Sequence, residues 1–350
     1  MSRRARPAGL AVLCGALALT ACGHVKMQPA GPPVQDPVLH SDHALMADGY
    51  RLPLHRWRSA EPPDAVVLGV HGFGDYGNGF AAMASALVDA GNTTVYAYDQ
   101  RGFGATERPG IWAGSDTLVA DLRTVVGLLR ARYPEAPVFL VAESMGGAVA
   151  LAALTRDAGL DVDGVVLLAP AVWGQQAMPW YQRLVLRLMV RIAPGATFSG
   201  DTVADLGIRP TDDPEVVRAL REDPLVQKKA RVDTLYGVTR LMGEALEADD
   251  RFGVPVLLLY GLNDHVIPPG PVCRWLERLA DAPDFPLRVV LYPGGYHMLT
   301  RYRAASRTLE DIAAWLTDRE CPVPAGEEVT LEEARTRVCA LPPKGFREHR

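Results

Sequence analysis

Six short apolar segments, each rich in Val and Leu, constrain the fold of this chain more than any other feature. They lie at 65–73, 93–99, 138–144, 162–170, 254–261 and 287–294. Most are continuously apolar rather than alternating, as expected of strands buried on both faces of a parallel sheet. Helix-length segments separate them at 77–90, 116–132, 145–157, 269–280 and 304–318. This alternation predicts an α/β fold with a mostly parallel, doubly wound sheet.

The predicted core spans 41–171 and 251–319. It begins with a hairpin and is interrupted by a cap. The segment HALMADGYRLPLHRW holds two short strand candidates on either side of Asp48-Gly49, a hairpin signal. Residues 172–250 have a helical pattern and no convincing strand, so they are expected to form a helical cap inserted after the sixth core strand. Such a cap would cover the carboxyl ends of the strands, where open α/β sheets bind ligands.

The N-terminus has the layout of an export signal. Three arginines precede the apolar run 10–19, which is too short to span a bilayer. The run ends in Leu19-Thr20-Ala21-Cys22, which resembles the lipobox of bacterial lipoproteins and implies acylation of Cys22. We therefore expect a signal peptide over 1–21, a flexible tether over 22–40, and a lipid-anchored protein on the periplasmic or outer-membrane face of a bacterial envelope. The alternative is an ordinary cleaved signal with an incidental cysteine.

Export changes the interpretation of the remaining cysteines, because compartments outside the cytoplasm permit disulfides. Cys321 and Cys339 lie in the polar tail 320–350, and a bridge between them is possible. Cys273 is then left over as a buried apolar residue. No metal-ligand spacing is present, so no metal or cofactor is expected, and the formal charge of -5 gives no reason to expect a nucleic-acid partner.

Ser144 lies in VAESMGG, where a predicted strand meets a predicted helix. This strand-turn-helix context is that of a catalytic serine in a nucleophile elbow, although Ala142 breaks the G-x-S-x-G pattern. A serine that merely caps a helix is the alternative. A serine also needs a base and an orienting carboxylate before it can act as a nucleophile. Asp264 and His297 follow in that order, each in the loop after a strand, so the three residues form a candidate catalytic triad.

Two other histidines compete for the role of base. His71, in VHGFGDYG, directly follows a strand and is expected to hold that loop while a neighbouring backbone N–H faces the substrate. His265 is adjacent to Asp264 and is expected to point elsewhere.

These residues resemble those of the α/β-hydrolases of the monoacylglycerol lipase and lysophospholipase group, also filed with the serine aminopeptidase-like hydrolases. The resemblance covers about 42–318 and rests on HGFGDYG, YDQRGFGATE, AESMGG, DPL, GLNDHVIP and GGYHML. It implies that Phe73 and Met145 supply the two backbone N–H groups of an oxyanion hole. It also implies a serine hydrolase acting through an acyl-enzyme on a small lipid-like ester. One departure is Glu143, which stands where the family usually has histidine; its carboxylate would either disfavour an anionic intermediate or face away.

The predicted cap offers two features relevant to binding an acyl chain. Its first part is dense in apolar side chains that could line a channel, although such side chains also pack on cores. Arg183, Arg187 and Arg191 recur every four residues and predict a basic stripe that meets phosphate head groups or, alternatively, solvent or acidic partners. Other functions stay open: an esterase, thioesterase or aminopeptidase on non-lipid substrates, or a non-catalytic envelope binding protein. Epoxide and haloalkane hydrolysis need Asp where Ser144 stands.

Overall fold

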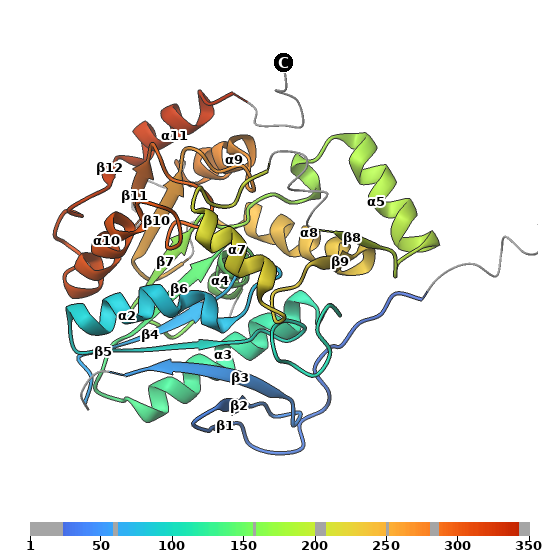
Figure 1. Cartoon of the computed structure of the whole chain (residues 1–350), viewed down its shortest axis with the longest axis horizontal. Coiled ribbons are helices and arrows are strands. Elements are labelled where there is room, and N and C mark those ends of the chain that lie inside the picture. The colour runs from blue at the N-terminus through green and yellow to red at the C-terminus, as the bar shows by residue number, and fades with distance from the viewer. Residues whose placement is uncertain are drawn as a thin grey trace, which may run out of the picture.

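A twisted central sheet organises the molecule (Figure 1). The computed structural model describes residues 24–58, 62–156, 159–199, 208–249, 252–280 and 287–342. Within these ranges the main sheet has ten strands in the order β1-β2-β3-β5-β4-β6-β7-β10-β11-β12. Neighbours from β5 to β11 are parallel, whereas the pairs at both edges are antiparallel. The strands are β1 (Val38–Leu39), β2 (His43–Leu45), β3 (Arg51–Trp57), β4 (Ala65–Val70), β5 (Thr93–Tyr98), β6 (Val138–Glu143), β7 (Gly164–Leu168), β10 (Val256–Gly261), β11 (Leu287–Tyr292) and β12 (Glu327–Val329).

The predicted fold class is confirmed, and the apolar runs explain it. In β4, Val66 and Leu68 belong to the core on one face of the sheet, and Val67 belongs to the core on the other. Strands β4, β6, β7 and β10 are buried along their whole length. Burial on both faces is why these strands are continuously apolar rather than alternating.

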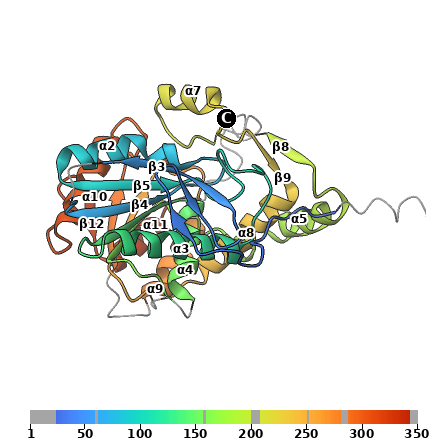
Figure 2. The same cartoon turned by 90° about the horizontal axis from the view of Figure 1, so that it is seen from below.

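Helices cover both faces of this sheet, as Figure 2 shows from below. On one face lie α2 (Ala81–Ala90), which follows the 3₁₀ turn η1 (Gly77–Phe80), and α10 (Ala305–Thr317). The other face carries α3 (Ser115–Arg132), α4 (Met145–Thr155), α8 (Val232–Leu246), α9 (Pro269–Ala280) and α11 (Leu331–Cys339). No helix in the described ranges is both long and apolar enough to cross a membrane.

The cap follows β7, the sixth of the strands that the sequence predicted. It contains the 3₁₀ turn η2 (Gln175–Ala177), α5 (Trp180–Ile192), α7 (Pro214–Glu222) and α8, together with a small antiparallel pair that the sequence did not indicate, β8 (Thr197–Ser199) and β9 (Lys229–Arg231). Its hydrogen bonds reach loops at the carboxyl ends of the core strands. Gln227 N donates to Gly74 O after β4, and its Nε2 donates to Gly102 O after β5. Met298 N, after β11, donates to Pro210 O of the cap.

Residues 24–40 do not form the predicted flexible tether. Gln28 pairs with the loop before α3, its backbone N donating to Trp112 O at 2.9 Å and its Nε2 to Ile111 O at 2.6 Å. Ala30 N donates to Thr117 Oγ1, and β1 adds a strand to the edge of the sheet. The prolines that suggested a tether are compatible with this extended, edge-lying backbone. The predicted signal and Cys22 lie outside the described residues.

The predicted tail is also folded over 320–342. Strand β12 pairs antiparallel with β11, and α11 packs against the core through Ala334 and Val338. The start of α11 is capped by Thr330, whose Oγ1 accepts a hydrogen bond from Glu333 N at 3.1 Å. The Thr-x-x-Glu spacing is typical of a helix start, and it could have indicated α11 in what the sequence suggested was only a polar tail.

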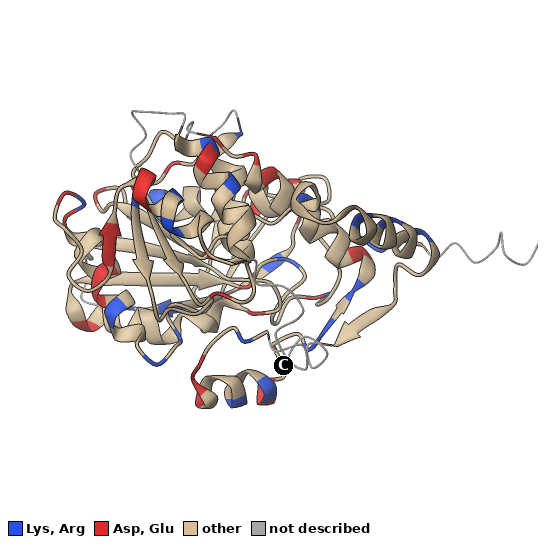
Figure 3. Cartoon of the chain, turned by 90° about the horizontal axis from the view of Figure 1, so that it is seen from above, with Lys and Arg blue, Asp and Glu red and all other residues tan. Residues whose placement is uncertain are grey.

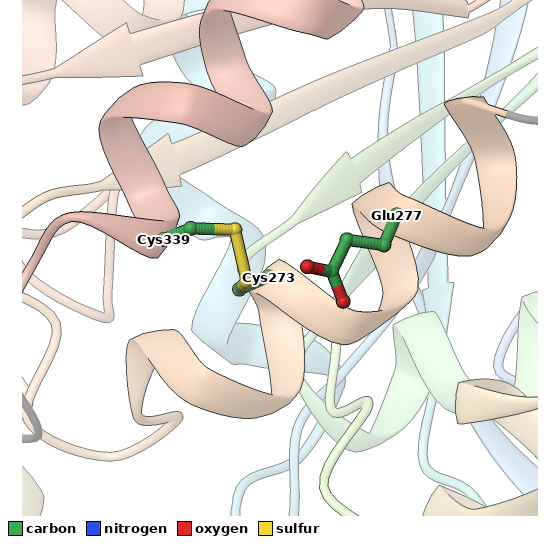
Figure 4. Close-up of side chains that lie close together, drawn as sticks. All are labelled: Cys273, Glu277 and Cys339. Carbon is green, nitrogen blue, oxygen red and sulfur yellow. A yellow bond between two sulfur atoms is a disulfide. The ribbon is translucent and has the colours of Figure 1, made fainter.

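The predicted pairing of Cys321 with Cys339 is wrong. The disulfide joins Cys273, on α9, to Cys339, at the end of α11 (Figure 4). Cys321 is a free, exposed thiol. The docking of α11 on α9 brings these two cysteines together, and spacing along the chain could not indicate that contact. Glu277 lies beside the bridge, but the sulfurs bond to each other, so the pair offers no thiolate to a metal ion.

Candidate active site

Ser144 occupies a strained turn at the carboxyl end of β6. Its backbone has φ 53° and ψ -115°, a positive φ that side chains other than glycine rarely adopt. The turn is fixed by backbone hydrogen bonds on both sides: Ser144 N donates to Leu168 O at 3.0 Å, and Ser144 O accepts from Ala171 N at 2.9 Å. The serine is therefore held between β6 and α4 by the neighbouring strand β7.

Close packing around the turn explains its small residues. A Cβ added at Gly146 would lie 2.0 Å from Val70 O, so only glycine fits there. A Cβ at Gly72 would lie 3.2 Å from Ser144 Cβ, which places the loop after β4 against the serine. Ala142 is fully buried, and its methyl group fits where the usual pattern has glycine.

Asp264 and His297 meet at the same edge of the sheet, in the loops after β10 and β11. His297 Nδ1 and Asp264 Oδ2 are 2.8 Å apart, and the two side chains are almost completely buried. Asp264 Oδ1 accepts hydrogen bonds from Val266 N at 2.7 Å and Ile267 N at 2.9 Å. The carboxylate is thus held by its own loop and fixes the orientation of the imidazole.

The surroundings of His297 make it more basic than an ordinary imidazole. Burial lowers its pKa, but the negative charge of Asp264 and the hydrogen bond to it raise the pKa, and the Glu143 charge raises it further. The Arg301 charge lowers it, and the net effect is a pKa above the ordinary value.

The structure brings Asp264 and His297 into direct contact, and it places Ser144 at the carboxyl end of β6 in the same sheet. Strands β7, β10 and β11 follow β6 in order across that sheet. Among the described residues, the Ser144 hydroxyl makes no hydrogen bond to His297. Catalytic hydrogen bonds are often long before substrate binds, so the arrangement is compatible with general-base chemistry.

The two backbone N–H groups expected to bind an oxyanion have no hydrogen-bond partner within the described part of the chain. Met145 is the first residue of α4, where an N–H has no intrahelical acceptor. Phe73 lies in the loop after β4, next to Gly72, which packs on Ser144.

His71 holds that same loop. Its Nδ1 donates to Gly72 O at 2.8 Å, and its Nε2 accepts from Gln100 N at 2.9 Å. Burial lowers the pKa of His71, which agrees with a neutral ring that accepts one hydrogen bond and donates the other. The His265 ring lies 5.9 Å from the Tyr296 ring, tilted by 57°. Among the described residues it makes no hydrogen bond to the Asp264 carboxylate or to Ser144.

Glu143 neither faces away nor stands alone. Its Oε2 lies 3.0 Å from Arg301 Nη2, which also lies 2.5 Å from Asp75 Oδ2. The sequence did not single out Arg301 or Asp75, because nothing in the pattern shows that the loops after β4 and β11 approach one another.

Comparison with known proteins identifies the chain. The parallel sheet, the strained serine turn and the Asp264–His297 pair define the α/β-hydrolase class. The sequence profile described as "Serine aminopeptidase, S33" matches residues 61–302, so the chain belongs to that family.

Its relatives include lipases. The monoacylglycerol lipase of Mycolicibacterium smegmatis is 28% identical over 282 residues, covering 79% of this chain and 96% of the relative. Human monoglyceride lipase is 25% identical over 297 residues, covering 83% and 95%. The fold matches that of a soluble variant of monoglyceride lipase from Saccharomyces cerevisiae in complex with a substrate analog, with a TM-score of 0.64 and 20% identity over 83% of this chain and all of that one (100%). The chain is a carboxylic ester hydrolase.

Proposed function

We propose that this protein hydrolyses the ester bond of single-acyl lipids, such as a monoacylglycerol or a lysophospholipid, through an acyl-enzyme on Ser144. The observation that carries the proposal is the strained Ser144 turn at the sheet edge that also bears the buried Asp264–His297 pair. Packing alone does not require these residue types in these loops.

The geometry supports a two-step acyl transfer. His297 takes the proton of Ser144 as the hydroxyl attacks the ester carbonyl, and later returns it to the leaving alcohol. Asp264 accepts the hydrogen bond from Nδ1 and stabilises the imidazolium. The N–H groups of Phe73 and Met145 stabilise the developing oxyanion, and water then cleaves the acyl-enzyme.

A substrate panel tests this function. Monoacylglycerols, lysophospholipids, p-nitrophenyl esters and aminoacyl amides are compared with wild type and Ser144→Ala. We expect serine-dependent turnover of the single-acyl lipids. Turnover of aminoacyl amides alone would replace this substrate class with the peptidase activity that the family description names. No turnover of any member would favour a binding protein.

We further propose that the protein works at a membrane surface. Helix α5 has no buried side chain, and Trp180, Val185 and Ile192 are 69%, 57% and 62% exposed. Tyr181, Leu184 and Leu188 add to this apolar face. The helix also carries three arginines and no acidic residue. In Figure 3 it is the helix at the right, with blue segments for its arginines. An apolar face bordered by arginines suits the boundary between acyl chains and anionic head groups.

The start of the described chain lies at the same helix. A cavity of about 860 Å³ is lined by Val25 and Met27 together with Arg187 and Arg191 of α5, and Ser144 does not line it. Val25 follows Cys22 by three residues, which span about 10 Å at most. A lipid on Cys22 and the apolar face of α5 would therefore enter the same leaflet.

Liposome flotation of the unlipidated protein tests the role of α5. With anionic vesicles, we expect binding that falls when Arg183, Arg187 and Arg191 are all changed to Ser. Arg335→Ser on α11 is the matched control. Equal flotation of the triple variant and wild type would show that these arginines do not contribute to membrane binding.

A further inference from the structure

One arginine side chain links the three loops that build the candidate active site. The Arg301 guanidinium, on the loop after β11, contacts Asp75 on the loop after β4 and Glu143 at the end of β6. Asp75 lies two residues beyond Phe73, Glu143 directly precedes Ser144, and Arg301 follows His297 by four residues. Each loop thus contributes one charge to the cluster and one group to the proposed chemistry.

The cluster is shielded from water. The side chains of Arg301, Asp75 and Glu143 are 12%, 6% and 4% exposed. Gly79 packs against it so closely that a Cβ there would lie 2.7 Å from Asp75 Oδ2. Buried charges are costly unless they are paired, so removing one member leaves the others uncompensated. Two carboxylates share one guanidinium, which leaves a net negative charge beside the nucleophile turn.

The backbone of Arg301 extends the link to the cap. Its carbonyl oxygen accepts a hydrogen bond from Thr211 Oγ1 at 2.7 Å, and its N donates to Met298 O at 2.9 Å within the His297 loop. The residue therefore fixes the loop that carries His297 on its cap side and on its core side.

We propose that Arg301 is a positioning residue: by pairing with Glu143 and Asp75 it holds the oxyanion loop, the nucleophile turn and the His297 loop in one arrangement, and its positive charge offsets part of the negative charge that faces His297. The proposal rests on the proposed hydrolase function. It gives Glu143, the residue that departs from the family pattern, a defined partner.

The charges around His297 support this role. Asp264 faces it from the loop after β10, Glu143 from β6, and Arg301 from its own loop, with Asp75 beyond Arg301. His71, also in the neighbourhood, is neutral because its Nε2 accepts a hydrogen bond from Gln100 N. The Glu143 charge raises the pKa of His297 and the Arg301 charge lowers it. Glu143 and Arg301 therefore shift the pKa of His297 in opposite directions.

The test is the pH dependence of kcat/KM for a soluble p-nitrophenyl ester. Because His297 must be neutral to accept the proton of Ser144, its pKa sets the acidic limb. Glu143→Gln should move that limb to lower pH, and Arg301→Met should move it to higher pH. Combining the two changes should bring the limb back toward that of wild type.

Rates add a second readout. Arg301→Met should lower kcat by about 10- to 100-fold with KM nearly unchanged, because misplacement of reacting groups acts on the chemical step. Arg301→Lys, which keeps the charge, should recover part of the loss. Arg303→Met, the same change two residues along at an exposed side chain, is the matched control. Fluorophosphonate titration counts the folded sites in each preparation.

Limbs that stay at the wild-type pH in both single variants, or that move in the same direction, would overturn the proposal. If Arg301→Met does not fold, an unmoved limb in Glu143→Gln alone overturns it. Ser144→Ala distinguishes failure of the proposed function from failure of the role of Arg301. Full activity of Ser144→Ala rejects the hydrolase mechanism itself. If Ser144→Ala is inactive but the limbs of the Glu143→Gln and Arg301→Met variants do not move, only the role of Arg301 is rejected.

Discussion

Removing the disulfide between Cys273 and Cys339 should destabilise the protein by about 4 kcal/mol. The bridge closes a loop with a sequence separation of 66 residues. In the loop-entropy description, closing a loop of that length removes about 15 cal/mol/K from the unfolded chain, or about 4 kcal/mol at 25 °C. The double change Cys273→Ser/Cys339→Ser should lower the free energy of unfolding by that amount. Cys321→Ser, at an exposed free thiol, should change it by less than about 0.5 kcal/mol.

Urea unfolding followed by circular dichroism measures the difference, and non-reducing peptide mapping identifies the linked cysteines. If α11 detaches before the core unfolds, the double variant will show an early transition confined to the residues after β11. A peptide linking Cys321 to Cys339, or equal stability of the oxidised protein and the double variant, would refute the assignment.

Three further predictions concern the candidate site. Gly146→Ala should lower the free energy of unfolding by at least about 1–3 kcal/mol and remove activity, because its methyl group would collide with Val70 O. The control Gly127→Ala, whose methyl group would have no atom within 4 Å, should be neutral or stabilising. Urea unfolding measures both. Asp264→Asn should lower kcat by about 10³- to 10⁴-fold in steady-state assays with little change in KM, because the imidazolium loses its counter-charge; a kcat within tenfold of wild type would contradict the triad. The acidic limb of kcat/KM should lie above the ordinary pKa of imidazole, because the pKa of His297 is raised, and activity should fall as pH decreases through it; a limb below that value would contradict the assignment of the base.

The sheet and the nucleophile turn could be predicted because their causes are local. Continuously apolar runs such as VVLGV in β4 indicate strands that are buried on both faces of the sheet. The change from a strand pattern to a helix pattern at Ser144 is also visible in the sequence. Asp264 and His297 could be paired because parallel strands bring the loops after them to one edge of the sheet.

Other features depend on contacts between distant segments, which periodicity does not encode. Cys273 meets Cys339 only because α11 docks on α9, and Arg301 meets Glu143 only because two catalytic loops converge. Segment 24–40 contains prolines and no regular pattern, yet backbone and side-chain hydrogen bonds hold it on the surface. The start of α11 was also missed, although its signal is local: the Thr330–Glu333 capping spacing is present in the sequence.

Labelling of the nucleophile tests the central claim most directly. The protein is treated with a fluorophosphonate probe, digested, and the adduct is located by mass spectrometry, with Ser144→Ala treated in parallel. The account predicts one adduct, on Ser144, whose formation abolishes ester hydrolysis and which is absent from the inactive Ser144→Ala variant. A reproducible adduct on another residue, together with full activity of Ser144→Ala, would contradict it.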